Sequence, residues 1–94
     1  MEKMNVTRVK IRMNGKETET KVRAYATVVL NDCFRISGIK VIDGQHGLFI
    51  SFPRFQLTNG QYQDLVSPVD KEGRKYIQEQ VLNSFHSEMI EQTA

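Results

Sequence analysis

Few residues of this 94-residue chain carry side chains capable of covalent chemistry. Cys33 or Ser51 could supply a nucleophile, with His46 as the base and Asp43 as the group that orients it. Asp43, however, precedes a glycine, and such an aspartate commonly accepts a backbone hydrogen bond within its own turn. Cys33 falls at the start of an expected strand, where a cysteine usually behaves as a small apolar residue. We therefore predict that the protein is not an enzyme, and a small hydrolase around His46 and Asp43 is the weaker alternative.

The chain also lacks the ligand pattern of a metal site. Its cysteine and two histidines stand at positions 33, 46 and 86, too few and too far apart to match the spacing of zinc ligands. Gly44 and Gly47 do not form a phosphate-binding loop, because such a loop opens into a helix and this segment opens into a strand. We expect no metal, no cofactor and no small-molecule substrate.

Basic side chains are the remaining candidates for a binding site, and they are distributed unevenly. Residues 1–40 carry nine basic and four acidic side chains, a net charge of +5, whereas residues 41–94 carry four and seven, a net charge of −3. Binding a phosphate backbone requires several cations together. In a small domain, however, an uneven charge more often reflects an ordinary solvated surface.

The basic residues divide into two groups. Arg8, Lys10 and Arg12 alternate with apolar residues and share one face of an expected strand, with Arg23 as a further member of that side. Arg54, Arg74 and Lys75 surround an expected loop and the start of an expected helix. We assign the strand face to solvent and take the second group as the candidate site.

Hydrophobic periodicity predicts one α+β domain, an antiparallel β-meander of about four to five strands followed by a C-terminal amphipathic helix. The expected strands cover residues 6–13, 21–30, 33–42 and 48–52, with a short extended piece at 62–66, and the helix covers residues 71–90. Asp70 is the expected N-cap, and Ile77, Val81, Phe85 and Met89 recur every four residues along the helix. The length supports one core, so residues 1–94 form a single domain whose core spans about residues 5–90.

The connections between the expected strands carry turn residues. A polar hairpin loop is expected over residues 14–20, a tight turn at Asn31-Asp32 and a five-residue turn at 43–47. In that last turn we expect Asp43 to cap the backbone and Gly44 to adopt a conformation that other residues avoid. The apolar face changes at Ser37-Gly38, which predicts a β-bulge.

No apolar run approaches the roughly 18 residues that a membrane helix needs, and the first residues lack the apolar region of a secretory signal. The single cysteine, Cys33, fits a reducing compartment. We therefore expect a cytoplasmic protein without membrane contact. Because a core of this size is small, a dimer that enlarges it is also expected.

Several segments, taken in order, resemble one bacterial family. They are Arg-Ala-Tyr-Ala-Thr-Val at 23–28, Ile-Lys-Val-Ile-Asp-Gly at 39–44, Gly-Leu-Phe-Ile-Ser-Phe-Pro at 47–53, the segment 60–69 and the helical positions 77–82. Together they are similar to the stage V sporulation protein G (SpoVG) family, also called septation proteins. The resemblance covers nearly the whole domain, and its most specific part is residues 41–44 followed by 47–49.

The resemblance implies a small α+β domain that dimerises through its sheet and binds DNA, and in some members RNA, at specific sites without catalysis. It implies an influence on gene expression in cell division or sporulation. Family contacts to nucleic acid lie after the fourth strand and around the helix. Here Arg54 follows Pro53, Arg74 takes the place of a family arginine with Lys75 beside it, and Lys40 takes the place of a family basic residue.

Two hypotheses follow from the residues and the resemblance. The first is a homodimeric nucleic-acid-binding regulator in which Lys40, Arg54, Arg74 and Lys75 contact phosphates. The alternative is a dimeric protein-interaction scaffold with little affinity for nucleic acid.

Overall fold

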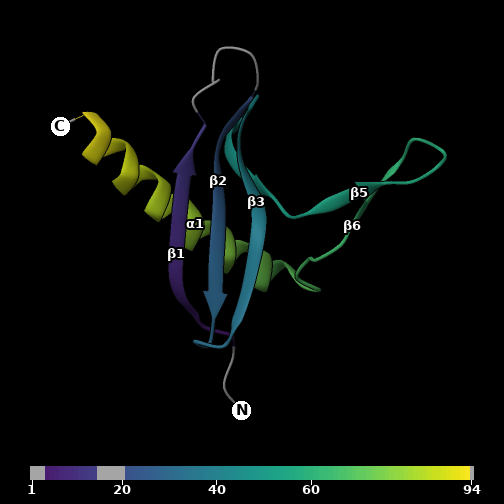
Figure 1. Ribbon diagram of the computed structural model, residues 1–94, viewed down its shortest axis with the longest axis horizontal. Helices are drawn as coiled ribbons and strands as arrows, with labels where there is room; N and C mark the ends of the chain where they lie inside the picture. The colour runs from purple at the N-terminus through teal and green to yellow at the C-terminus, as the bar shows by residue number, and fades with distance from the viewer. Residues whose placement is uncertain (1–3, 15–20, 94) are drawn as a thin grey trace.

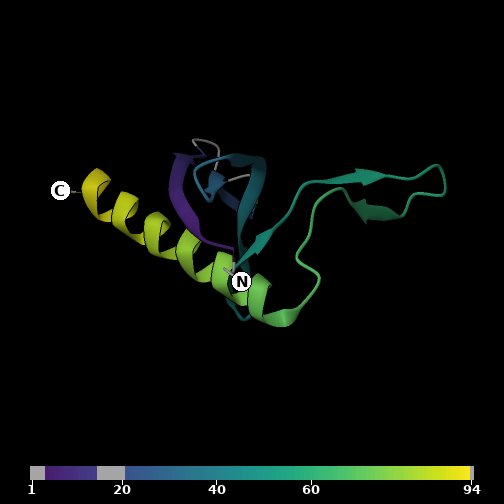
Figure 2. The ribbon, with the colours of Figure 1, turned by 90° about the horizontal axis from the view of Figure 1, so that it is seen from below.

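The computed structural model describes residues 4–14 and 21–93, and this part of the chain has the predicted α+β architecture. Its elements are β1 (Val6–Met13), β2 (Val22–Leu30), β3 (Phe34–Gly44), β4 (Gly47–Ser51), β5 (Arg54–Gln56), β6 (Tyr62–Asp64) and α1 (Lys71–Thr93). The first four strands form an antiparallel sheet in the order β1-β2-β3-β4, which confirms the meander. Helix α1 crosses behind this sheet in Figure 1 and lies on one side of it in Figure 2.

Strands β5 and β6 form a separate two-stranded hairpin, called here the arm (residues 54–64). The sequence predicted a loop or an irregular hairpin followed by an extended piece at 62–66, whereas the strand itself ends at Asp64. Figures 1 and 2 show the arm projecting away from both the sheet and α1. All six strand residues of the arm are exposed, so the arm adds no side chain of its strands to the core.

The core lies between the sheet and α1. Buried apolar side chains come from the strands β2, β3 and β4, from Phe52 and from one face of the helix: Ala24, Ala26, Val28, Ile36, Ile39, Val41, Ile50, Phe52, Ile77, Val81 and Phe85. Ile77, Val81 and Phe85 are therefore buried as the four-residue period predicted. Met89, the fourth position, is 36% exposed, because α1 continues past the edge of the sheet (Figure 2).

The bulge predicted at Ser37-Gly38 is confirmed. Ala26 pairs with Ile39 and Val28 pairs with Ile36, so three steps along β3 match two steps along β2. Gly38 takes a φ of +81°, which L side chains rarely adopt. The extra residue keeps both Ile36 and Ile39 facing the helix.

The turn after β3 is tighter than predicted. β3 runs to Gly44 and β4 begins at its partner Gly47, so only Gln45 and His46 form the turn. Asp43 lies inside β3, where it pairs with Leu48, and not in the turn. The positive φ belongs to Gly47, at +115°, and not to Gly44. The tight turn predicted at Asn31-Asp32 is present, and both residues have positive φ. The loop expected at 14–20 falls largely outside the described residues.

Helix α1 begins at the predicted cap and ties itself to both edges of the sheet. The Asp70 Oδ1 accepts a hydrogen bond from the Gly73 N–H at 2.8 Å, which confirms the N-cap. On the β1 edge, the Tyr76 hydroxyl accepts the Val6 N–H at 2.9 Å. On the β4 edge, Ile50 donates its N–H to Gln78 Oε1 at 3.1 Å and accepts from Arg74 Nη2 at 3.3 Å. Helix side chains thus form hydrogen bonds with edge backbone groups that would otherwise be available to pair with another strand.

Replacing Gly38 with valine should destabilise the fold without removing any charge. A valine at this φ is strained by about 1–3 kcal/mol, although its Cβ would meet only Pro53 Cγ, at an ordinary 3.7 Å. The free energy of unfolding, measured by urea titration with circular dichroism, should fall by that amount. Ser37→Ala, at the exposed neighbouring position, should change it by less than about 0.5 kcal/mol. An unaltered midpoint for Gly38→Val would mean that the bulge is not required.

Candidate nucleic-acid interface

The four basic residues predicted to bind nucleic acid come from three elements, β3, the arm and α1. Lys40 alternates with buried residues of β3 and therefore points away from α1. Arg54 lies on the arm, and Arg74 and Lys75 lie in the first turns of α1; we call these three the helix-start group. The fold therefore separates Lys40 from the other three, and all four side chains are exposed.

Contacts hold both arginines of the helix-start group in place. In addition to its hydrogen bond to the Ile50 carbonyl, the Arg74 guanidinium lies 5.6 Å from the centre of the Phe52 ring. The Arg54 guanidinium lies 4.9 Å from the centre of the Tyr62 ring. Such cation–π contacts orient the guanidinium groups without neutralising them.

Carboxylates accompany the helix-start group. Asp64 stands directly opposite Arg54 in the arm ladder, and Asp70 and Glu72 lie at the beginning of α1. Opposite charges on directly paired residues attract one another. The helix-start group therefore attracts a polyanion less strongly than three isolated cations would.

The face of the sheet that points away from α1 is more basic, and we call it the open face. Five exposed basic side chains lie on it: Arg8, Lys10, Arg12, Arg35 and Lys40. The one carboxylate within β1–β4 belongs to Asp43, which pairs with Leu48. Leu48 packs against the core, so Asp43 points to the helix side of the sheet. The strands thus give the open face five positive charges and no negative one.

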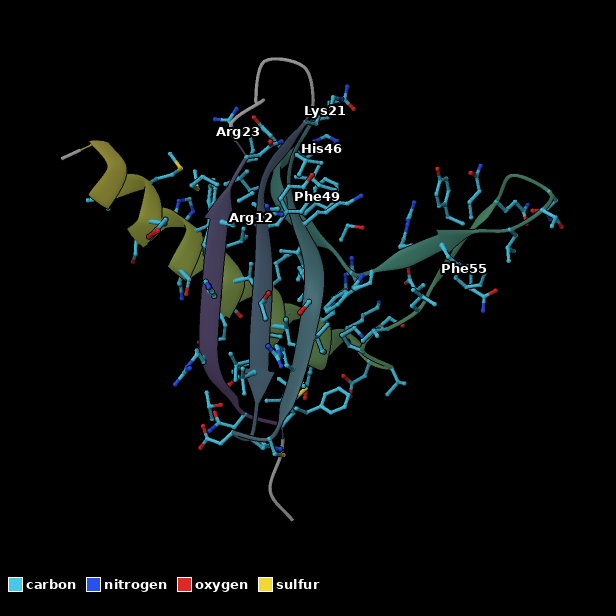
Figure 3. All side chains as sticks on the ribbon, in the orientation of Figure 1. Arg12, Lys21, Arg23, His46, Phe49 and Phe55 are labelled. Atoms are coloured by element: carbon cyan, nitrogen blue, oxygen red, sulfur yellow. The ribbon has the colours of Figure 1, made fainter. Side chains whose placement is uncertain are left out.

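The ladders align residues of the open face in a row across all four strands. Arg12 pairs with Tyr25, Tyr25 with Lys40, and Lys40 with Ser51. The Arg12 guanidinium lies over the Tyr25 ring, 5.1 Å from its centre. Arg23, which the sequence placed on the same side, is half-buried at the loop end of the sheet (Figure 3).

Phe49 adds an exposed aromatic ring to the open face. It alternates in β4 with the buried Ile50, and 40% of its surface is exposed. One side of the ring lies against Gly44, where the Cβ of any larger residue would lie only 2.6 Å from ring Cε1. Figure 3 looks onto the open face and shows Phe49 and Arg12 on it, with Phe55 far away on the arm.

Sequence reasoning identified only part of the open face. The alternation in β1 correctly placed Arg8, Lys10 and Arg12 on one face. Alternation alone does not group Arg35 with them, because its direction depends on how the bulge at Gly38 is accommodated. That glycine is the signal that could have placed Arg35 on the same face as Lys40.

The hydrolase alternative finds no support in the geometry. Cys33 precedes β3 and His46 follows it, so eleven strand residues, roughly 35 Å, separate them. The Ser51 hydroxyl donates to the Phe52 carbonyl at 3.5 Å, and Ser51 pairs with Lys40. A cavity of about 250 Å³ beside the helix start is lined mainly by apolar side chains.

Among the described residues, no three potential metal ligands gather in one place. No helix in this part of the chain is long and apolar enough to cross a bilayer.

Comparisons with known proteins agree with the sequence resemblance. The SpoVG family model matches residues 4–87. A protein of Phytoplasma australiense is 39% identical over 83 residues, which cover 87% of this chain and 83% of the relative. A Borrelia hermsii protein is 36% identical over 86 residues, 90% of each chain, and a Bacillus subtilis protein is 36% identical over 83 residues, 88% of this chain and 84% of the relative.

All three relatives carry the provisional name septation protein SpoVG. The matched region contains the whole four-stranded sheet, the arm and most of α1. The match therefore covers the open face and the helix-start group. This chain belongs to the SpoVG family.

Proposed function

We propose that the protein binds nucleic acid and acts through binding without turnover. One observation carries the proposal: the open face presents five exposed cations and no carboxylate from its strands. Lys and Arg side chains that neutralise phosphates release the counterions condensed on a nucleic acid, and this release favours binding to any sequence. The open face therefore has the charge that a phosphate backbone requires.

The sheet also fixes the spacing of these cations. Side chains on one face of a strand stand about 6.8 Å apart, and neighbouring strands lie about 4.8 Å apart. The backbone beneath Lys10, Arg12 and Lys40 is already ordered by ladder hydrogen bonds on both sides of β2. Binding then orders side chains but not the main chain, which lowers its entropic cost.

The helix-start group is a second set of phosphate contacts in this proposal. Arg54 and Arg74 are already oriented by Tyr62 and Phe52 and remain exposed. Arg74 also supports the β4 edge, so its loss would affect the fold as well as binding. Arg54 and Lys75 are therefore the better residues with which to test this group.

The names of the relatives suggest the biological setting. Proteins similar to this chain are named for septation. We place the proposed binding in the control of gene expression during cell division or sporulation, in the cytoplasm.

We also propose a homodimer in which the arm contributes to the contact. The arm and the segment after it expose large apolar side chains: Phe55, Tyr62, Leu65, Val66 and Val69. The ladder places Phe55 and Tyr62 on opposite faces of the arm, because Phe55 pairs with Gln63 and Tyr62 with Gln56. Each face therefore offers an aromatic side chain, a residue type enriched in protein interfaces. The sheet edges are less suitable, because helix side chains bind Val6 and Ile50 there.

A protein-interaction scaffold remains the second candidate function, and the same arm favours it. Phe55 and Tyr62 project from a hairpin that lies apart from the core. A different protein could cover these two side chains in the same way as a second copy of this chain. In that case the apolar arm, and not the open face, would be the functional surface.

Removing two cations from the open face should weaken nucleic-acid binding and reduce its salt dependence. The double variant Lys10→Gln/Lys40→Gln loses two phosphate contacts per protomer, so the slope of log affinity against log salt should flatten by about 1.8 for each open face that contacts the duplex. Both side chains are exposed, so thermal stability should hardly change. Fluorescence anisotropy with a labelled mixed-sequence duplex, measured at several salt concentrations, gives the slope.

The matched control is Arg54→Gln/Lys75→Gln, which removes the same charge from the helix-start group. We expect a smaller flattening, because Asp64 already offsets Arg54. Equal slopes for the Lys10→Gln/Lys40→Gln variant and the unmodified protein would remove the open face from the proposal. No binding by the unmodified protein at low salt would refute the nucleic-acid function and leave the scaffold.

Light scattering should give the mass of two chains of 10.9 kDa each. Phe55→Asp places a charge on the apolar arm and should shift the protein toward monomer. Phe34→Asp makes the same change at another exposed phenylalanine, at the far end of the sheet, and should leave the dimer intact. A mass of one chain at every concentration would contradict the dimer.

A further inference from the structure

The open face combines cations with flat surfaces on which a base could stack. Phe49 is the first such surface, since one side of its ring covers Gly44 and 40% of the residue remains exposed. The Arg12 guanidinium, lying over Tyr25, is the second. Arginine guanidinium planes and aromatic rings are the groups on which proteins stack unpaired bases.

These two surfaces lie close to the cations. Arg12 belongs to the same cross-strand row as Lys40, and Phe49 stands two residues from Ser51, which closes that row on β4. Lys10 lies two residues before Arg12 on the same strand face. Phe49 and Lys10 thus lie in the rows on either side of the Arg12–Lys40 row, and a chain crossing the sheet from β1 to β4 would meet cations and stacking surfaces within three adjacent rows.

A duplex and a single strand would use this face differently. A duplex keeps its bases stacked inside and offers a flat protein face mainly phosphates, so an exposed phenylalanine gains little from it. A single strand offers both phosphates and unpaired bases, and stacking on aromatic side chains tolerates any base. An apolar ring among five cations therefore favours the single strand.

We propose that the open face binds single-stranded nucleic acid, with one base stacked on Phe49, a second on the Arg12 guanidinium, and phosphates neutralised by Lys10 and Lys40. The inference rests on the nucleic-acid function proposed above, and it names the class of ligand and its place on the sheet. The helix-start group is not part of this site.

A second copy of the chain is a poor occupant of the open face. A two-fold interface brings the same patch of each protomer together. Two open faces would then oppose five cations to five cations with no strand carboxylate between them. A ligand with many negative charges avoids this repulsion.

The test compares labelled single-stranded DNA and RNA of mixed sequence with the matching DNA duplex, by fluorescence anisotropy over a series of salt concentrations. We expect the unmodified protein to bind a single strand more tightly than the duplex at each salt concentration. Phe49→Ala should weaken single-strand binding between about 5-fold and 150-fold, the cost of losing one base–aromatic stack. It should leave the salt slope and the duplex affinity unchanged, because no charge is lost.

Three variants guard against an effect on folding. Phe49→Leu keeps an apolar cover over Gly44 without an aromatic plane and should lose single-strand affinity as Phe49→Ala does. Phe49→Tyr keeps the plane and should bind as the unmodified protein does. Phe34→Ala, at an exposed phenylalanine outside the open face, should also bind normally. Thermal melting of each variant checks that it is folded.

Two results would overturn the inference while leaving the nucleic-acid function intact. One is a duplex affinity equal to or above that of the single strands. The other is unchanged single-strand affinity in both Phe49→Ala and Phe49→Leu. Binding to anionic lipid vesicles that single strands cannot displace would assign the open face to a membrane surface and overturn it as well. No binding of any nucleic acid at low salt would instead refute the proposed function itself.

Discussion

Helix α1 is held against one face of the sheet, and most other features of the molecule depend on this contact. Ile77, Val81 and Phe85 bury their side chains there, each contributing about 1.5–3 kcal/mol of hydrophobic stabilisation. Tyr76 and Gln78, on either side of Ile77 in the sequence, extend to β1 and β4 and bind backbone groups at both sheet edges. One helix therefore closes one face and part of each edge, and the opposite face is left to solvent or to a ligand.

The bulge in β3 decides which residues reach that open face. If β3 alternated regularly, Ile36 would lie on the open face with Lys40, and Arg35 would point toward the core. The extra residue at Gly38 reverses the phase, so Ile36 is buried and Arg35 lies opposite Val29 on the open face. The bulge at Gly38, with its φ of +81°, therefore both buries Ile36 in the core and places Arg35 on the open face. Without the bulge, the same residues would bury the Arg35 guanidinium and expose Ile36.

Much of the fold could be predicted because the sequence signals were local. Alternation defined β1 and β2, four-residue spacing defined the buried face of α1, and Asp70 marked its first turn. The turn after β3 was predicted too long, because Asp43 and Gly44 are turn-forming residues that the ladder to β4 nevertheless holds in strand conformation. The surfaces were harder to predict. Whether Lys40 lies near Arg54 depends on which face of the sheet the helix covers. The residue pattern of one β-strand does not contain that information.

The cations of the open face and the exposed apolar side chains of the arm lie on different elements. Cations gather on the rigid four-stranded sheet, whereas Phe55, Tyr62 and Leu65 lie on or just after an arm that projects from the body. Charge repulsion opposes self-association through the open face, and apolar burial favours association through the arm. Since the two surfaces do not share elements, a second copy bound at the arm would leave the strands of the open face uncovered. Association at the arm would then give an assembly with two basic sheet faces, and a polyanion long enough to reach both would be held more tightly than by either face alone.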